Sequence, residues 1–229
     1  MVGATIAELK AEGMLPVVDG SIVPMDSPIA VKEAVLPFKR FRTKDGLIVD
    51  SLLGPEMRST GEVMGIDRDF PRAFAKSQEA AYGGLPTSGT VFVSVSDRDK
   101  RAIVLPVLRL LELGFDILAT AGTAEVLNRN GITARIVRKF SEGASADGDE
   151  PTVVDLINRN EVDIVVNTPS GSSARADGYE IRAAAVAADK PLFTTIAQLG
   201  AAVASFEATR EGFDVSSLQE YAIARAARL

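Results

Sequence analysis

Hydrophobic and polar residues alternate with two different periods from residue 90 onward. Short apolar runs predict strands at Thr90–Val95, Phe115–Ala119, Ala134–Val137, Asp163–Val166 and Leu192–Thr194. Amphipathic segments between and after them predict helices at Asp97–Leu113, Thr123–Asn130, Val153–Asn158, Glu180–Ala188 and Ile196–Arg210. Pro106 is expected to kink the first of these helices. Strands and helices that alternate at this spacing favour right-handed βαβ crossovers, so we expect an α/β fold with a parallel sheet covered by helices on both faces.

The first part of the chain is poorer in regular structure. We expect a short helix at Thr5–Glu12, a strand at Val31–Leu36 and a helix at Pro71–Ala81, separated by loops at Val18–Pro28 and Leu52–Gly65. The stretch Tyr82–Gly89 is rich in Gly, Ser and Pro, which favours a boundary between residues 1–85 and 86–229. About 85 residues with so few elements would struggle to cover a core. We therefore expect this part to pack on the second domain or to end a larger fold.

Two further segments complete the survey of the chain. Val215–Leu229 is predicted to form a last helix that docks on the body, and Ser141–Pro151 is polar, acidic and predicted to be a mobile loop. The run Phe38–Lys44 mixes cations with aromatic residues. In an acidic protein we interpret it as a solvated strand edge or hairpin rather than a nucleic-acid site.

Composition and charge narrow the possible functions. The 229 residues are 46% hydrophobic and 24% charged, contain no Cys and no His, and carry a formal net charge of −6. Without Cys and His, disulfides, thiolate metal sites and most hydrolase and zinc chemistries are excluded, and we predict neither a catalytic residue nor a metal site. The negative charge argues against nucleic-acid and anionic-membrane partners. No apolar run reaches the roughly 18 to 20 residues of a membrane span and Met1–Lys10 lacks a signal pattern, so we predict a cytoplasmic protein.

Ligands of an open parallel sheet bind outside the carboxyl ends of the strands, so the residues that follow each predicted strand are the candidate site. They are Ser94, Ser96, Lys100, Thr120, Gly122, Thr123, Lys139 and Asn167. Hydroxyls and two lysines around a glycine turn that opens a helix favour a small anion.

Structural roles remain open for the same residues. Thr123 can serve as an N-cap and Gly122 as a turn residue, while the two lysines can be solvated surface groups. Asn167 can contact a ribose or a base, or it can form an Asx-turn stiffened by Pro169. The carboxylates of Asp97 and Asp99 are interpreted as solvated charges.

Two sequence blocks carry a family resemblance. Leu53–Gly65 (LGPEMRSTGEVMG), preceded by Val31–Pro37 (VKEAVLP), resembles the end of the second ATP-grasp half of the carbamoyl-phosphate synthetase large-subunit family. The region from about Gly89 onward resembles that family's methylglyoxal-synthase-like, Rossmann-like allosteric domain. The resemblance implies a carboxy-terminal fragment, in which residues 1–85 are an ATP-grasp remnant and 86–229 the allosteric domain.

The resemblance also implies a function for the candidate site. In the family, UMP inhibits and IMP binds an overlapping site, and the phosphate-holding positions match Lys100, Thr120, Thr123 and Lys139. Asn167 matches the amide that faces the ribose and base, whereas Pro169 replaces a base-side threonine and removes its hydroxyl. An ornithine-type site of some members would retain only Glu33 and Thr194 here, so ornithine binding is expected to be weak or undetectable.

The family's synthetase is a ligase that makes carbamoyl phosphate from glutamine, bicarbonate and ATP for pyrimidine and arginine synthesis. Its nucleotide, magnesium and bicarbonate residues lie upstream of the matching region, so the resemblance implies that this chain is not catalytic alone. ATP, magnesium and potassium are expected only for the full-length enzyme, and its glutaminase small subunit is not expected to touch this fragment. Two alternatives are a methylglyoxal-synthase-like lyase, disfavoured by the missing histidine, and a module that self-associates into a homo-oligomer.

Overall fold

The computed structural model describes residues 3–14, 27–138, 150–168, 171–210 and 212–226. The chain forms two compact units, one made of Met1–Ser27 with Ser217–Leu229 and the other of Pro28–Ser216. The smaller unit contains helices α1 (Ile6–Ala11) and α8 (Leu218–Ala226). Both helices were expected. Docking of the last helix on the body concerns the placement of one unit against the other and stays a prediction.

A side-chain cap starts each helix of the smaller unit. The Thr5 hydroxyl accepts the Glu8 N–H at 3.2 Å, and the Glu8 carboxylate accepts the Thr5 N–H at 2.7 Å. Ser217 and Glu220 repeat this capping box at α8, at 3.1 and 2.6 Å. These caps satisfy N–H groups that have no partner inside the helix.

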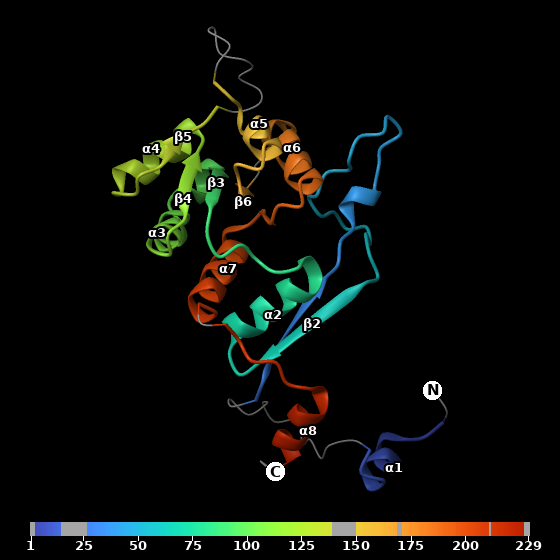
Figure 1. Ribbon diagram of the computed structural model, residues 1–229. Coiled ribbons are helices and arrows are strands. Elements are labelled where there is room, and N and C mark those ends of the chain that lie inside the picture. Colours follow the sequence, from blue (N-terminus) through green and yellow to red (C-terminus); the bar gives the residue numbers. More distant parts are fainter. Residues whose placement is uncertain (1–2, 15–26, 139–149, 169–170, 211, 227–229) are drawn as a thin grey trace. The chain divides into compact units, whose positions relative to one another are not determined.

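A five-stranded sheet forms the centre of the larger unit (Figure 1). Its strands are β3 (Thr90–Val95), β4 (Asp116–Ala119), β5 (Arg135–Ile136), β6 (Ile164–Thr168) and β7 (Leu192–Phe193). All neighbours are parallel, and the order across the sheet is β5-β4-β3-β6-β7. The α/β fold predicted from the alternating pattern is confirmed. The chain builds outward from β3 in one direction, then crosses over to β6 and builds in the other, so β3 and β6 flank the topological switch point.

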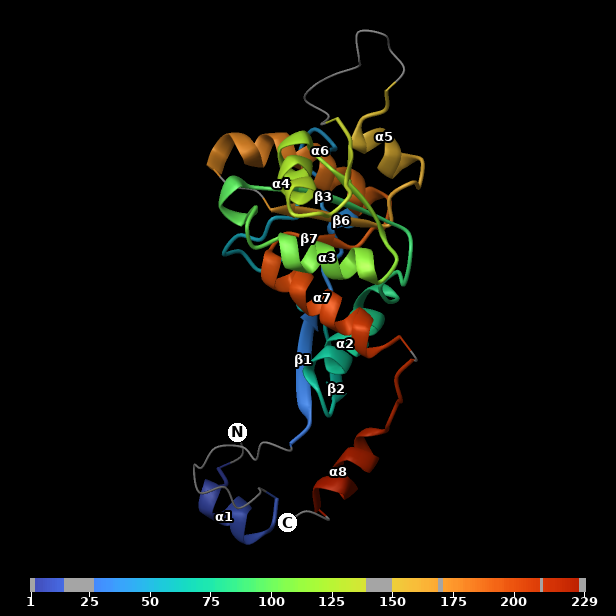
Figure 2. The same ribbon diagram turned by 90° about the vertical axis from the view of Figure 1, so that its left-hand side faces the viewer.

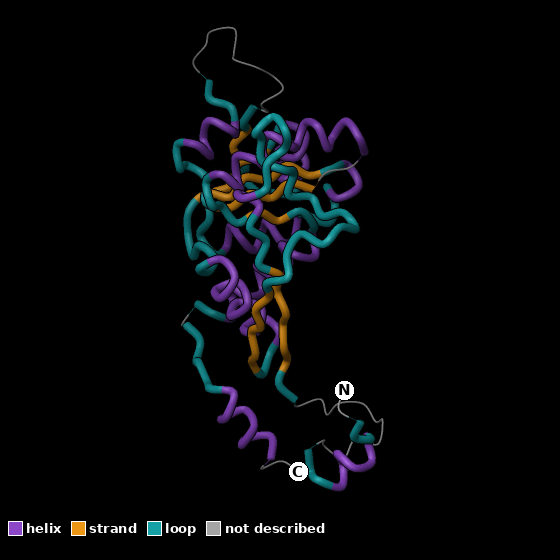
Figure 3. The backbone as a smooth tube through the Cα atoms, turned by 90° about the vertical axis from the view of Figure 1, so that its right-hand side faces the viewer, coloured by secondary structure: helices purple, strands orange, loops and turns teal. Residues whose placement is uncertain are grey.

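Helices cover both faces of this sheet (Figure 3). One core joins Val91, Val93 and Val95 to α3 (Val104–Glu112), α4 (Ala121–Arg129) and α7 (Ile196–Ala208). The other core joins Phe92, on the opposite face of β3, to α5 (Val153–Asn158) and α6 (Gly171–Ala187). Figure 2 shows α3 and α7 side by side. The continuous apolar run of β3 thus reflects burial on both faces.

The starts of α3, α4 and α6 differ from the predicted helix starts. The segment Asp97–Leu113 begins with a 3₁₀ turn, η2 (Asp97–Asp99), and the α-helix starts only at Val104. Pro106 is therefore the third helical residue, where the N–H that proline lacks would have no intrahelical partner, and the predicted kink was wrong. Helix α4 starts at Ala121 rather than Thr123. Helix α6 starts at Gly171 rather than Glu180, so the Gly/Ser-rich sequence after β6 is helical although its helix propensity is low.

A strand hairpin and a helix precede the sheet. β1 (Ile29–Ala34) pairs antiparallel with β2 (Glu62–Asp67), and α2 (Phe70–Tyr82) lies against both. The end of the predicted loop Leu52–Gly65 is therefore a strand. The signal was hidden by Gly65, which weakens a strand pattern. A Cβ at this position would lie 2.0 Å from the Ala73 carbonyl oxygen, so the glycine is what allows α2 to approach β2.

The first part of the larger unit packs on the α/β part, as expected. Phe74 of α2 belongs to the same core as α7, and residues 28–216 form one compact unit. The division between residues 85 and 86 stays a prediction.

The run Phe38–Lys44 enters a hairpin in which Arg42 and Ile48 form an antiparallel bridge, which confirms the hairpin interpretation. Of the predicted mobile loop Ser141–Pro151, residues 141–149 lie outside the described residues.

Candidate functional site at the switch point

The ends of β3 and β6 bring polar residues together at the switch point. In the parallel register, Ser94 lies opposite Asn167 and Val95 opposite Thr168. The neighbouring strand β4 ends at Ala119 and is followed directly by Thr120. Three separate segments of the sequence thus meet at the edge of the sheet where ligands of such folds bind.

The hydroxyls of this edge form a buried cluster. The Thr120 Oγ1 lies 3.4 Å from the Ser94 Oγ and 3.3 Å from the Thr123 Oγ1. The Thr123 Oγ1 also accepts the Val95 N–H at 3.4 Å. Thr120 is 4% exposed and Thr123 is 1% exposed. The contacts among the hydroxyls are long, so they can be exchanged for shorter bonds to an anion at little cost.

The N-terminus of α4 lacks a side-chain cap. Its N-cap residue is Thr120, but the Thr120 hydroxyl accepts no N–H of the first helical turn. By contrast, the N-cap side chains of α1, α2, α5 and α7 each accept such an N–H. The positive end of the α4 dipole is therefore not neutralised by its own cap, which favours an anion there.

Lys100 approaches this helix end through Gly122. A Cβ at Gly122 would lie 3.1 Å from the Lys100 Nζ, so the missing side chain leaves room for the ammonium group. The Nζ pairs with the Asp97 carboxylate at 2.7 Å, and the Asp97 side chain is 94% exposed. An ion pair with so exposed a partner contributes little. An incoming anion can therefore compete with Asp97 for the ammonium.

Asp99 anchors the 3₁₀ turn that carries Lys100. Its carboxylate accepts the Ser96 hydroxyl at 2.7 Å, and the Ser96 N–H donates to the Thr168 Oγ1 at 3.2 Å. Burial alone would raise the pKa of Asp99, but hydrogen bonds from Thr168 and Ser96 and the nearby Arg98 charge hold it below its usual range. The interpretation of Asp99 as a solvated charge was therefore wrong. Asp99 and Thr168 help to fix the strand ends.

Asn167 is held by a buried arginine that we did not predict. Arg182 of α6 is fully buried, and its Nη1 donates to the Asn167 Oδ1 at 2.8 Å. Its Nε and Nη2 donate to the two carboxylate oxygens of Asp50 at 2.7 and 2.6 Å. The one available sequence signal was a single cation within the small apolar run Ile181–Ala187. The other predicted role of Asn167, in an Asx-turn with Pro169, falls partly outside the described residues.

The remaining predicted site residues are Lys139, Glu33 and Thr194. Lys139 lies outside the described residues. Glu33 on β1 accepts the Gln78 Nε2 at 3.1 Å, and burial raises the pKa of its carboxyl against the lowering effect of that hydrogen bond. The Thr194 N–H donates to the Gln198 Oε1 at 3.4 Å. No hydrogen bond joins Glu33 to Thr194 in the part of the chain that the structure describes.

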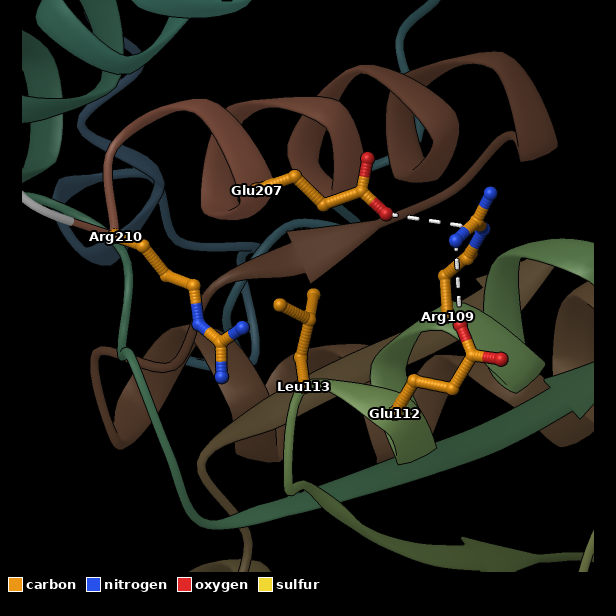
Figure 4. Close-up of a pocket in the computed structure, with 5 residues that line it drawn as sticks. All are labelled: Arg109, Glu112, Leu113, Glu207 and Arg210. Carbon is orange, nitrogen blue, oxygen red and sulfur yellow. Dashed lines mark hydrogen bonds and ion pairs between the residues drawn. The ribbon is translucent and has the colours of Figure 1, made fainter.

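A surface pocket lies elsewhere, between the carboxy-terminal ends of α3 and α7 (Figure 4). Its volume is about 170 Å³, and it is lined by Arg109, Glu112, Leu113, Glu207 and Arg210. Arg109 pairs with Glu112 at 3.3 Å and with Glu207 at 3.8 Å. Because α3 begins near the carboxyl end of β3, its own carboxy-terminal end is at the opposite edge of the sheet. We interpret this pocket as a solvated ion-pair network.

The described residues hold no group of three or more Asp or Glu side chains that could bind a metal ion. Among the helices that the structure describes, none has both the length and the apolar character to cross a bilayer.

Comparisons with known proteins show which proteins this chain resembles. The family model of the MGS-like domain matches residues 102–194. The carbamoyl phosphate synthase large chain of Clavibacter sepedonicus is 82% identical over 228 residues, which cover 100% of this chain and 21% of the relative. The large chain of Beutenbergia cavernae is 68% identical over 229 residues, again 100% of this chain and 21% of the relative.

A solved methylglyoxal synthase from Elizabethkingia anophelis aligns with a TM-score of 0.41 at 18% identity, over 53% of this chain and 80% of its own. The chain spans about a fifth of the length of the large chains it matches. By its full-length similarity and its MGS-like domain, the chain is related to the carbamoyl phosphate synthase large chains and corresponds to a segment of them.

Proposed function

We propose that this chain is a regulatory module that binds a nucleoside monophosphate, UMP or IMP, at the ends of β3, β4 and β6. The phosphate would lie at the N-terminus of α4, against Lys100, Thr120, Gly122 and Thr123. Asn167 would face the ribose and base. The uncapped helix end with a lysine beside Gly122 is the observation that carries the proposal.

The arrangement of charge supports a phosphate ligand. A phosphate monoester carries close to two negative charges at pH 7, and the α4 N-terminus, the Lys100 ammonium and the threonine hydroxyls can each donate a hydrogen bond to it, while the Asp97 carboxylate on Lys100 is exposed and can be displaced. Lys139 follows the neighbouring β5 and would add a second cation. A neutral ligand would gain nothing from the positive charge at this site. A carboxylate, with two oxygens, would accept fewer hydrogen bonds from these donors than a phosphate would.

In the longer large chains, the bound nucleotide would control carbamoyl phosphate synthesis for pyrimidines and arginine. Control requires that UMP binds two states of the enzyme with different affinities. The synthetase reaction, its ATP and metal ions, and the glutaminase small subunit would belong to the full-length enzyme. The proposed contribution of this segment is the effector site.

Calorimetric titration and thermal unfolding of the 229-residue chain with UMP, IMP, ornithine and inorganic phosphate test the proposal. A ligand at about 100 times its dissociation constant adds roughly 2.7 kcal/mol, worth about 5 to 10 °C. We expect shifts with UMP and phosphate and none with ornithine. A shift with UMP that IMP does not reproduce would show that the base is recognised, and equal shifts would show that only ribose and phosphate are.

Two lysine variants make the test specific. Lys100→Met should weaken UMP binding by roughly 1.5 to 3 kcal/mol, the scale of a hydrogen bond to a charged group. Lys44→Met removes the same charge from an exposed position in the hairpin near β1 and should bind UMP as the wild-type chain does. Equal affinity in Lys100→Met and Lys44→Met would refute the site. No binding of UMP or phosphate by the wild-type chain would refute the function.

A further inference from the structure

Arg182 has a position that the proposed phosphate contacts do not explain. Its side chain has no exposed surface, and its guanidinium joins two residues that are 117 positions apart in the sequence, Asp50 and Asn167. Asp50 belongs to the segment before β2, and Asn167 belongs to the strand end of the candidate site. Arginine side chains are rarely fully buried unless their charge is paired, and a buried pair needs well-defined hydrogen-bond geometry.

The contact with Arg182 fixes the orientation of the Asn167 amide. A guanidinium has only hydrogen-bond donors, so the amide must turn its oxygen toward Arg182. The Oδ1 lies 2.8 Å from the Arg182 Nη1, and the Nδ2 lies on the opposite side, 3.5 Å from the Ser94 carbonyl oxygen. That second contact is at the outer limit of a hydrogen bond. The amide therefore offers its N–H donors toward Ser94 and the candidate site.

Asp50 prevents the guanidinium from turning away. Both carboxylate oxygens accept from Arg182, at 2.7 and 2.6 Å, in the bidentate geometry that positions an arginine most strictly. The neighbouring Tyr179 hydroxyl donates to the Ile48 carbonyl oxygen at 2.6 Å and holds the same segment on α6. The 48–50 segment thus determines where the guanidinium lies.

Gly178 completes the arrangement. A Cβ at this position would lie 2.3 Å from the Arg182 Nη1 and 2.7 Å from the Asn167 Oδ1. Only glycine leaves room for this contact on the side of α6 that faces β6. The amide orientation therefore depends on an aspartate, an arginine and a glycine from two separate segments.

We propose that Arg182, locked by Asp50, is a positioning residue that makes Asn167 select ligands with a hydrogen-bond acceptor on the nucleoside part. The inference rests on the proposed nucleotide site. It adds that Asn167 offers hydrogen-bond donors, and not acceptors, to the nucleoside part of the ligand. A base carbonyl or a ribose oxygen fits the N–H donors of Asn167. A group that can only donate hydrogen bonds does not.

The test compares the affinities of the 229-residue chain for UMP and for inorganic phosphate by calorimetry. Asn167→Asp keeps an oxygen for Arg182 but replaces the N–H donors with an acceptor. The added charge repels both ligands, so the ratio of the two affinities is the readout. We expect the preference for UMP over phosphate to fall at least about tenfold, the effect of losing a hydrogen bond and opposing two acceptors.

Asn160→Asp is the matched control. Its Oδ1 also accepts from a basic side chain, Lys190 at 2.6 Å, but it precedes β6 and lies at the other edge of the sheet. It carries the same change of charge and should leave the affinity ratio as in the wild-type chain. A fall in the ratio as large in Asn160→Asp as in Asn167→Asp would overturn the inference.

Arg182→Lys tests the positioning role, because lysine keeps the charge but cannot bind Asp50 and Asn167 in a fork. We expect a lower UMP-to-phosphate ratio, whereas a purely structural arginine would lower the melting temperature and leave the ratio as it was. If this variant does not fold, Asp50→Asn provides the same readout. A preserved ratio in Asn167→Asp, Arg182→Lys and Asp50→Asn overturns the inference and leaves the phosphate site standing. Absence of UMP and phosphate binding by the wild-type chain overturns both.

Discussion

Replacing Gly178 by alanine should destabilise the protein, although alanine is normally the better helix residue. In the interior of a helix, Gly to Ala stabilises by roughly 0.5 to 1 kcal/mol. At Gly178 of α6, however, the added Cβ would lie 2.3 Å from the Arg182 Nη1 and 2.7 Å from the Asn167 Oδ1. Ordinary contacts of this kind are about 3.4 Å, so the guanidinium must retreat by about 1 Å.

The size of the effect follows from the bond that this retreat breaks. The Arg182–Asn167 hydrogen bond is 2.8 Å long, and a shift of about 1 Å takes it beyond hydrogen-bond distance. A hydrogen bond to a charged group contributes roughly 1.5 to 3 kcal/mol, from which the helix gain of about 0.5 to 1 kcal/mol is subtracted. The net loss is roughly 0.5 to 2.5 kcal/mol, and the melting temperature should fall by about 1 to 10 °C.

Thermal unfolding followed by circular dichroism measures this effect, and Gly200→Ala is its control. Gly200 lies in α7, and a Cβ there would meet no atom within 4 Å. Gly200→Ala should therefore raise the melting temperature by about 1 to 4 °C. The two variants make the same chemical change in two helices and should move in opposite directions. If Gly178→Ala is as stable as Gly200→Ala, the close contact with Arg182 does not constrain the helix.

Three further predictions concern other parts of the molecule. Thr123→Val removes a hydroxyl at nearly constant volume and should weaken UMP binding by roughly 1.5 to 3 kcal/mol in a calorimetric titration, with unaltered affinity contradicting its phosphate contact. Gly65→Ala should lower the melting temperature by about 2 to 12 °C, because overpacking costs about 1 to 3 kcal/mol and the new Cβ would lie 2.0 Å from the rigid Ala73 carbonyl oxygen; an unchanged melting temperature would contradict the close packing of α2. Burial raises the pKa of Glu33, so its neutral form is favoured by folding, and stability should be lost as pH rises from below 4.5 through the folded pKa. Glu33→Gln should therefore raise the melting temperature at pH 7 and less at pH 4, and an equal effect at both values would contradict this sign.

The sheet could be predicted from the sequence because its strands lie in short apolar runs between polar turns. Thr90–Val95 and Val153–Asn158 match their elements residue for residue, since each is fixed by local signals: an apolar run in one case and a Thr152 cap in the other. β2 was missed because its central Gly65 is favoured by contact with α2 and not by strand propensity. The start of α3 at Val104 was missed because the 3₁₀ turn η2 occupies the beginning of the predicted helix, and the start of α6 at Gly171 was missed because its Gly/Ser-rich sequence has low helix propensity.

The strand-end residues of the candidate site were predictable because topology places them together. Once the parallel order is known, Ser94, Thr120 and Asn167 must meet at one edge. Which groups these side chains contact was not predictable. Arg182 and Asp50 are 132 positions apart, and nothing in either local sequence indicates the other. Long-range ion pairs have no periodicity and no fixed spacing.

The same ion pair decides whether residues 86–229 can fold without the first part of the chain. A chain shortened to 86–229 would lose Asp50 and leave the fully buried Arg182 without its carboxylate. Removing one partner of a buried pair costs roughly 3 to 5 kcal/mol, reduced here because the Asp50 side chain is 30% exposed, and this is a large part of the roughly 5 to 15 kcal/mol that stabilises a domain. It would also lose Phe74 from the core beneath α7.

We therefore expect the shortened chain to melt at a much lower temperature than the full chain. Arg182→Met in the shortened chain should recover part of the loss, because it replaces a charge that has lost the Asp50 carboxylate with an apolar side chain of similar length. The same substitution in the full chain should destabilise it, because it leaves Asp50 unpaired. This reversal of sign is specific to the ion pair, since a general packing effect of methionine would have the same sign in both chains. If the shortened chain melts like the full one and Arg182→Met has the same effect in each, then residues 86–229 are an independent domain and the contact with Asp50 is dispensable.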